Sequence, residues 1–262
     1  CKSKACIRGN ERGWACPWGV YMGRLDRNND CGLCMECVRS CPNDNIALFA
    51  RPFTSDIQVK GYDESWRVFI MLTLAFVYSV ALMGPWGWIK DLANVSEEGN
   101  WGGFLAYAGF VTFTALTLFP AVYLGFVALS KWLAKAKDIP LKKLFIRYSY
   151  TLVPLGLLIM VAFSAPLIMV HGSYIISVIS DPFGWGWNLF GTAEFPWKPL
   201  YPEYIPHVQI VLLLIGLYFS IKSGYRISRT LFEKRKQAML SLVPLTVFLT
   251  GITIGFLRLY VG

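Results

Sequence analysis

Charged side chains and histidines are scarce in this chain of 262 residues: Asp, Glu, Lys and Arg together make up 16%, and there are only two histidines. The sequence also lacks a phosphate-binding loop, a dinucleotide fingerprint and a set of residues typical of a catalytic triad. No residues suited to bond-making catalysis are visible. The absences leave enzyme activity uncertain and favour a non-catalytic subunit.

Polar surface is too scarce for an ordinary soluble domain. Hydrophobic residues make up 55% of the chain, and the mean hydropathy of +0.46 is well above that of a typical soluble protein. Five apolar runs reach about 20 residues, the length that a helix needs to cross a hydrocarbon layer of about 30 Å. They lie near residues 68–89, 103–130, 149–172, 207–227 and 238–260. We therefore predict an α-helical membrane protein with about five transmembrane helices.

The N-terminal quarter of the chain differs in composition from the remainder. Residues 1–66 are polar and rich in Cys, Gly and Asn, whereas residues 67–262 contain the apolar runs. We predict a small N-terminal domain over 1–66 and a transmembrane domain over 67–262. The sequence begins at Cys1 without an initiator methionine, so we expect the N-terminal domain to be truncated and a further segment to precede it.

Basic residues, which give the chain a formal net charge of +9, lie mostly in short segments between apolar runs. The connections after the second and fourth runs each hold a cluster of Lys and Arg, whereas the opposite connections hold only Lys90 and Lys198. The positive-inside rule places the basic connections in the cytoplasm. The N-terminal domain is then cytoplasmic, the C-terminus lies outside, and the expected location is the inner (cytoplasmic) membrane. This distribution argues against nucleic acid as a partner.

All seven cysteines lie within the first 41 residues, which indicates a metal or disulfide cluster. The stretch from Cys31 through Cys34, Cys37 and Cys41 to Pro42 has the spacing C-x2-C-x2-C-x3-C-P of bacterial ferredoxins. In that pattern three close thiolates hold one 4Fe–4S cluster, and the fourth reaches a neighbouring cluster. A zinc ribbon would separate two pairs by a longer loop, and disulfides are disfavoured in a reducing cytoplasm. We predict two 4Fe–4S clusters.

The upstream cysteines complete the ligand sets, because Cys16-Pro17 can play the second Cys-Pro role of a two-cluster ferredoxin. The ligands predicted for the first cluster are Cys31, Cys34, Cys37 and Cys16. Those predicted for the second are Cys1, Cys6 and Cys41. Seven cysteines for eight positions leave the second cluster one ligand short. We expect another cysteine shortly upstream of Cys1; otherwise this site holds three irons or uses a non-cysteine or partner-chain ligand.

The run Gly13-Trp14-Ala15-Cys16-Pro17-Trp18-Gly19, followed by the Cys31 quartet and by membrane helices, resembles the membrane-bound polyferredoxin superfamily. That group includes the quinol-oxidising membrane ferredoxin of periplasmic nitrate reductase systems, the membrane regulator of nitrous oxide respiration and an assembly factor of cbb3-type oxidase. Its members often read C-G-W-x-C-P, but here Arg12 stands at the position of the first cysteine. The resemblance covers about residues 1–52 and implies electron transfer between quinol and a redox partner.

These observations lead to one functional hypothesis and two alternatives. The leading hypothesis is an electron-transfer subunit of a membrane-bound respiratory or quinone-linked oxidoreductase, with other redox subunits and membrane lipid as partners. One alternative is an assembly or metal-reduction factor for a respiratory oxidase. The other is a membrane redox regulator.

The two histidines, His171 and His207, fall near the outer ends of neighbouring predicted spans. Histidine at membrane depth is costly and often functional, so both are candidates to bind a quinone or haem b. A structural or interfacial role is the alternative. The connection between them, residues 181–206, is dense in aromatic residues, which predicts an interfacial belt or a docking surface for another subunit.

Overall fold

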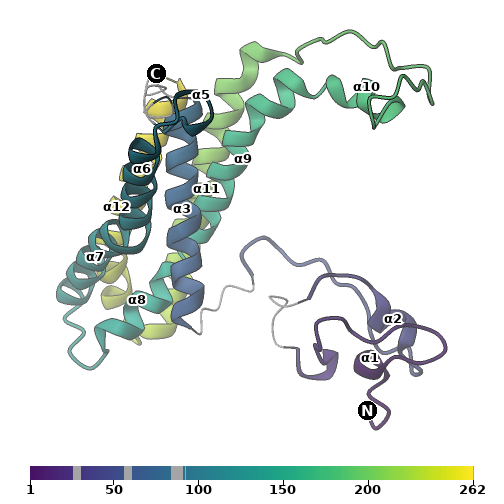
Figure 1. Cartoon of the computed structure of the whole chain (residues 1–262). Coiled ribbons are helices and arrows are strands. Elements are labelled where there is room, and N and C mark those ends of the chain that lie inside the picture. The colour runs from purple at the N-terminus through teal and green to yellow at the C-terminus, as the bar shows by residue number, and fades with distance from the viewer. Residues whose placement is uncertain (26–30, 56–60, 84–90, 92, 262) are drawn as a thin grey trace. The chain divides into compact units, whose positions relative to one another are not determined.

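The computed structural model describes residues 1–25, 31–55, 61–83, 91 and 93–261, and its chain divides into two compact units (Figure 1). The N-terminal unit is Cys1–Asp56 and the helical unit is Ile57–Gly262. In the described residues there is no β-strand, only an isolated antiparallel bridge between Asn10 and Gly13. The α-helical class is confirmed. The units divide ten residues before the boundary at residue 66 that composition suggests.

Four helical stretches of the described residues are long and apolar enough to cross a membrane, and they coincide with four of the five predicted spans. They are Trp101–Leu133, Leu141–His171, Pro202–Leu231 and Arg235–Val261. The first predicted span corresponds to helix α3, Tyr62–Met83, and residues 84–89 of that prediction lie outside the described residues. The helical unit is therefore that of a multi-pass membrane protein.

The elements of the helical unit follow one another with short breaks. After α3 come α5 (Val95–Glu98), α6 (Trp101–Phe113), the π-helical turn η2 (Thr114–Leu118), α7 (Phe119–Leu133), α8 (Leu141–Ser149), α9 (Leu152–His171), α10 (Tyr174–Ser180), the 3-10 turn η3 (Pro202–Tyr204), α11 (Ile205–Leu231) and α12 (Arg235–Val261). The π turn lies directly before Pro120, the second residue of α7. Proline clashes with the carbonyl four residues earlier, and a widened turn relieves that clash.

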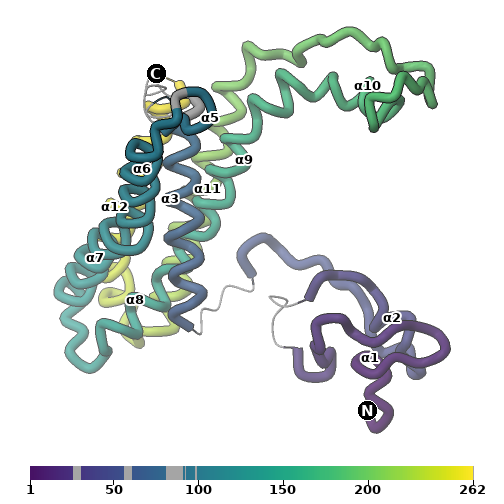
Figure 2. The backbone as a smooth tube through the Cα atoms, in the orientation of Figure 1, coloured from purple at the N-terminus to yellow at the C-terminus, as the bar shows by residue number. Residues whose placement is uncertain are grey.

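The bundle is arranged so that α11 packs against α9 and α12, α12 against α7, and α3 against α9 (Figure 2). Its centre is aromatic: the ring of Tyr123 lies 5.4 Å from that of Phe145 and 5.7 Å from that of Phe248, and Phe69 lies 5.2 Å from Tyr123. Such pairs contribute about 0.5–1.5 kcal/mol each beyond burial. Since lipid is as apolar as these side chains, shape and ring contacts hold the bundle together.

Hydroxyl and amide groups add hydrogen bonds between helices. The hydroxyl of Tyr148 in α8 lies 2.9 Å from that of Ser228 in α11 and 2.7 Å from that of Ser241 in α12. Gln209 in α11 donates to the carbonyl of Ala162 in α9 at 3.1 Å. Each such bond is worth about 0.6 kcal/mol in a membrane protein.

One end of the bundle gathers the basic connections. The start of α3 meets α8, because the Lys142 ammonium lies 4.6 Å from the centre of the Tyr62 ring and Ser149 donates to Ser65 at 2.8 Å. The bonds of Tyr148 bring the α11–α12 connection to the same end. Both clusters of Lys and Arg therefore share one end with the start of α3, as an alternating up-and-down bundle requires.

The segment between α9 and α11 is held by its own polar contacts. The Asp181 carboxylate accepts hydrogen bonds from the backbone N–H groups of Trp185 and Gly186, both at 2.9 Å. The indole of Trp197 donates to the carbonyl of Val170 at 2.9 Å. Aromatic side chains such as Trp185 remain exposed on this segment. Whether they form a lipid-facing belt or contact another subunit stays a prediction.

Candidate iron-sulfur site

The N-terminal unit has little regular structure and little core. Its helical pieces are α1 (Ala5–Arg8), the 3-10 turn η1 (Met22–Arg24) and α2 (Glu36–Ser40), of which α1 and α2 are in contact. Among its described residues only Ala5, Cys6, Ser40 and Cys41 are buried. Domains this small usually need disulfides, metals or partners to fold. The chemistry of the cysteines therefore bears directly on the stability of this unit.

The seven cysteines line two cavities. The first, the four-cysteine cavity, has a volume of about 240 Å³, and its thiols are those of Cys16, Cys31, Cys34 and Cys37. The second, the three-cysteine cavity, has a volume of about 400 Å³, and its thiols are those of Cys1, Cys6 and Cys41. Spacing alone divides the cysteines into the same two sets.

The two cavities are neighbours with a common apolar wall. The side chains that line both belong to Met22, Leu25, Ile46, Ala47 and Phe49. An apolar wall of this kind limits the access of water, which is one way in which a protein sets the reduction potential of a bound cluster. The arrangement suits two redox groups that lie side by side.

The loop that carries the Cys31 quartet curls because two of its residues are left-handed. Leu33 has φ of 54° and Met35 has φ of 64°, in a region that residues other than glycine seldom adopt. The curl places the N–H of Leu33 3.4 Å from the sulfur of Cys31. The N–H of Val20 lies at the same distance from the sulfur of Cys16. Backbone N–H groups that face sulfur are typical of iron-sulfur sites.

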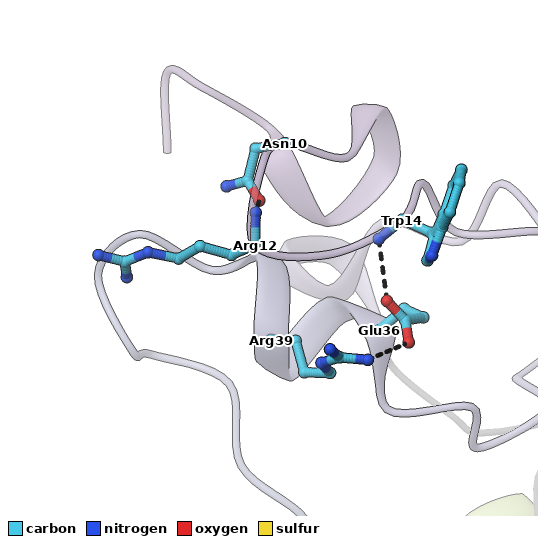
Figure 3. A network of polar contacts seen from close by, with 5 residues as sticks. All are labelled: Asn10, Arg12, Trp14, Glu36 and Arg39. Carbon is cyan, nitrogen blue, oxygen red and sulfur yellow. Dashed lines mark hydrogen bonds and ion pairs between the residues drawn. The ribbon is translucent and has the colours of Figure 1, made fainter.

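Hydrogen bonds tie the upstream cysteines to the quartet (Figure 3). The N–H of Trp14 donates to the carboxylate of Glu36 at 2.9 Å, and that carboxylate also pairs with Arg39 at 3.1 Å. Because Trp14 lies two residues before Cys16, and Glu36 directly precedes Cys37, this bond brings Cys16 to the four-cysteine cavity. Asn10 likewise donates to the carbonyl of Ser40 at 2.8 Å, next to Cys41.

One glycine is required by the close approach within this unit. Gly9 has φ of 76°, and a Cβ atom at this position would lie 2.7 Å from the backbone nitrogen of Ala15. No other residue type fits such a contact without a shift of the backbone. Gly9 therefore helps to set the path of the chain between α1 and Cys16.

The thiols of the quartet are close enough to influence one another. Burial raises the pKa of the Cys37 thiol, and the neighbouring Cys31 and Cys34 raise it further, against an opposing hydrogen bond from the N–H of Val38. Cysteines binding iron must be thiolates, so a cation at the centre has to overcome both effects.

The cysteines fit a cluster better than either alternative. All seven lie in described residues and none forms a disulfide. In the residues that the structure describes, no three His, Cys, Asp or Glu side chains converge tightly enough to hold a single metal ion. Tetrahedral zinc would require sulfurs about 3.8 Å apart. A 4Fe–4S cluster takes one thiolate on each iron at the corners of a larger body, so thiols spread around a cavity wall suit it.

The two histidines lie outside this unit, at the ends of two helices. His171 is the last residue of α9, and its ring stacks 6.1 Å from that of Tyr174. His207 lies in the first turn of α11, with the Tyr204 ring 6.1 Å away. Both side chains are exposed. Their proposed binding of quinone or haem b stays a prediction.

Two kinds of site residue escape sequence reasoning. The first kind orients the loops, as Glu36 and Asn10 do, and the second is the shared apolar wall. The wall has a sequence signal, since apolar residues are few in the cysteine-rich region, whereas the bond from Trp14 to Glu36 spans 22 positions and has none.

Comparison with protein-family models, with curated proteins and with solved structures finds no match for this chain. The resemblance to membrane-bound polyferredoxins thus depends on the motif residues alone.

Proposed function

We propose that this chain is an electron-transfer subunit of a membrane-bound respiratory or quinone-linked oxidoreductase, and that its N-terminal unit holds two 4Fe–4S clusters. The observation that carries the proposal is the division of the seven cysteines between two adjoining cavities, four in one and three in the other. Ferredoxins with two clusters share their fourth cysteines in the same crossed manner.

The residues have distinct parts in this proposal. The thiolates of Cys31, Cys34, Cys37 and Cys16 would hold one cluster, and those of Cys1, Cys6 and Cys41 would hold the other with one further ligand. A bound 4Fe–4S cluster accepts and releases single electrons. The backbone N–H groups of Leu33 and Val20 orient the thiolates, and the shared apolar wall excludes water from both sites.

The helical unit supports membrane attachment and a membrane partner. Its long apolar helices anchor the chain, and its basic end is assigned to the cytoplasmic side of the inner membrane by the positive-inside rule. A basic surface favours association with an acidic redox subunit. The C-terminus then lies on the outer side.

Metal analysis tests the proposal directly. The chain would be purified without oxygen and analysed for iron and acid-labile sulfide, with electron paramagnetic resonance after reduction. About eight irons per chain support two clusters, and about four confine the proposal to the Cys31 set. Zinc without sulfide, or cysteines joined as disulfides, would overturn it.

Co-purification separates the electron-transfer role from the alternatives of assembly factor and regulator. A permanent subunit is expected to co-purify with catalytic redox subunits at constant stoichiometry. Isolation of an iron-loaded chain without partners would overturn the subunit assignment while leaving the clusters in place.

A further inference from the structure

A cavity of about 530 Å³ lies within the helical unit and is distinct from the cysteine sites. Three helical stretches line it: α3, the stretch from η2 to α7, and α12. Its walls are mostly aromatic, including Phe76, Phe119 and Phe248. The volume falls in the range of about 300–1,000 Å³ that is usual for ligand pockets.

The cavity lies at the depth of the bilayer centre. Leu72 and Thr73 are midway along α3, Phe248 is midway along α12, and Thr114 begins the π turn in the middle of Trp101–Leu133. Water is absent from the hydrocarbon core, so a polar group there must find its partner in the protein or in a ligand.

Two hydroxyl groups in the cavity lack such a partner. The Oγ1 atoms of Thr73 and Thr114 are buried, and neither has a hydrogen-bond partner among the described residues. Thr73 as a whole is only 2% exposed. An unpaired buried hydroxyl costs about 1–3 kcal/mol. Both residues line the cavity.

Other hydroxyls of the bundle show how this cost is normally avoided. Thr253, which is equally buried, donates to the carbonyl of Leu249 at 2.9 Å, and Thr246 donates to that of Leu242 at 3.1 Å. Bonding to the carbonyl four residues earlier is the usual solution in a helix. Thr73 and Thr114 do not adopt it, which leaves both hydroxyls available to a ligand in the cavity.

The backbone around the cavity leaves room for a ligand. Gly251 and Gly255 line it, and a Cβ atom at either position would meet nothing within 4 Å. The wall formed by Thr114 is a π-helical turn. Such turns are rare and often occur at functional sites.

We propose that this bundle cavity binds a bilayer-soluble molecule with a flat ring and a ring carbonyl, the chemistry of a quinone. The phenylalanine side chains accommodate the ring, and the hydroxyls of Thr73 and Thr114 donate to its oxygen atoms. A lipid acyl chain would fill the same space but would leave both hydroxyls unpaired. The role of this molecule as the membrane-side electron partner rests on the proposed function, whereas its binding does not.

A matched pair of probe ligands tests the carbonyl requirement. Decyl-benzoquinone and decylbenzene share a ring and a tail, and only the first has ring oxygens. Binding to the full chain in detergent would be followed by native mass spectrometry and by thermal stabilisation. Preferential binding of the quinone supports the proposal. Equal binding of both, or binding of neither, overturns it.

Substitutions then locate the site. Thr73→Val and Thr114→Val remove the unpaired hydroxyls and should each weaken quinone binding about tenfold, the value of one hydrogen bond. Thr253→Val is the control, because its hydroxyl is bonded within α12, and it should leave quinone affinity unchanged. Equal losses from Thr73→Val and Thr253→Val would contradict the assignment.

A space-filling variant covers the case in which a threonine variant fails to fold. Gly251→Leu should block the cavity and abolish quinone binding, whereas Gly125→Leu, at a glycine that also faces open space in α7 but does not line the cavity, should not. Unchanged binding in Gly251→Leu overturns the proposal. Iron content should be normal in every variant, so failure of this site and failure of the cluster assignment are distinguishable.

Discussion

The N-terminal unit and the helical unit differ in what stabilises them. The helical unit has a continuous core in which Phe69, Tyr123 and Phe145 are buried together. The N-terminal unit has only a few small buried residues around two cavities lined by thiols. The comparison teaches that the helices can fold through their own packing, whereas the cysteine unit depends on what occupies its cavities.

Removal of iron should produce the largest contrast between the units. A chelator under reducing conditions should unfold residues 1–56, because metal binding supplies most of their folding free energy, and should leave the helical unit intact. Limited proteolysis would then cleave the N-terminal unit rapidly, while the far-ultraviolet helix signal is largely kept. Protease resistance equal to that of the untreated protein would contradict the dependence on metal.

Cys34→Ala should remove one cluster. It takes away a ligand of the four-cysteine cavity, so the iron content is expected to fall from about eight to about four per chain. Val38→Ala is the matched control, because Val38 lines the same cavity without offering a thiol. A similar loss of iron in both variants would show that the cavity is sensitive to any change and would remove support for the ligand set.

Phe69→Ala should affect only the helical unit. The side chain is fully buried among aromatic rings, and its loss is expected to lower the free energy of unfolding by about 3–5 kcal/mol. Phe110→Ala, at an exposed position, should change it little. Denaturant unfolding in mixed micelles measures both, and iron content should match that of the unmodified protein.

Glu36→Ala should have the smallest effect of these changes. It removes the acceptor of the Trp14 N–H, a bond at the surface that contributes about 1 kcal/mol. The first cluster should be lost to chelator a few times faster, while Glu11→Ala, also in the N-terminal unit, should leave the rate unchanged. If chelation of Glu36→Ala proceeds at the unmodified rate, the bond does not position Cys16.

Sequence periodicity predicts the helices well because the requirement to span a bilayer is one of length and composition. Four predicted spans appear within a few residues of their expected ends. The π turn before Pro120 and the break between α8 and α9 were not predicted, since both depend on how a helix accommodates its neighbours.

The candidate sites show the same division. Thr73 and Thr114 look like ordinary packing residues until the position of α12 is known, because the cavity exists only where three helical stretches meet. The histidines stood out by their rarity, but the structure shows them exposed beside tyrosines.

The amino-acid sequence by itself determined the membrane-spanning helices, the crowding of the cysteines and their spacing, since these are local properties of the chain. Only the tertiary structure decided that the thiols group around two adjoining cavities and that two threonine hydroxyls stay unpaired at mid-depth. The physical reason is that both results depend on contacts between residues far apart in sequence. Such contacts arise from shape and hydrogen bonding in the folded chain, which no short motif records.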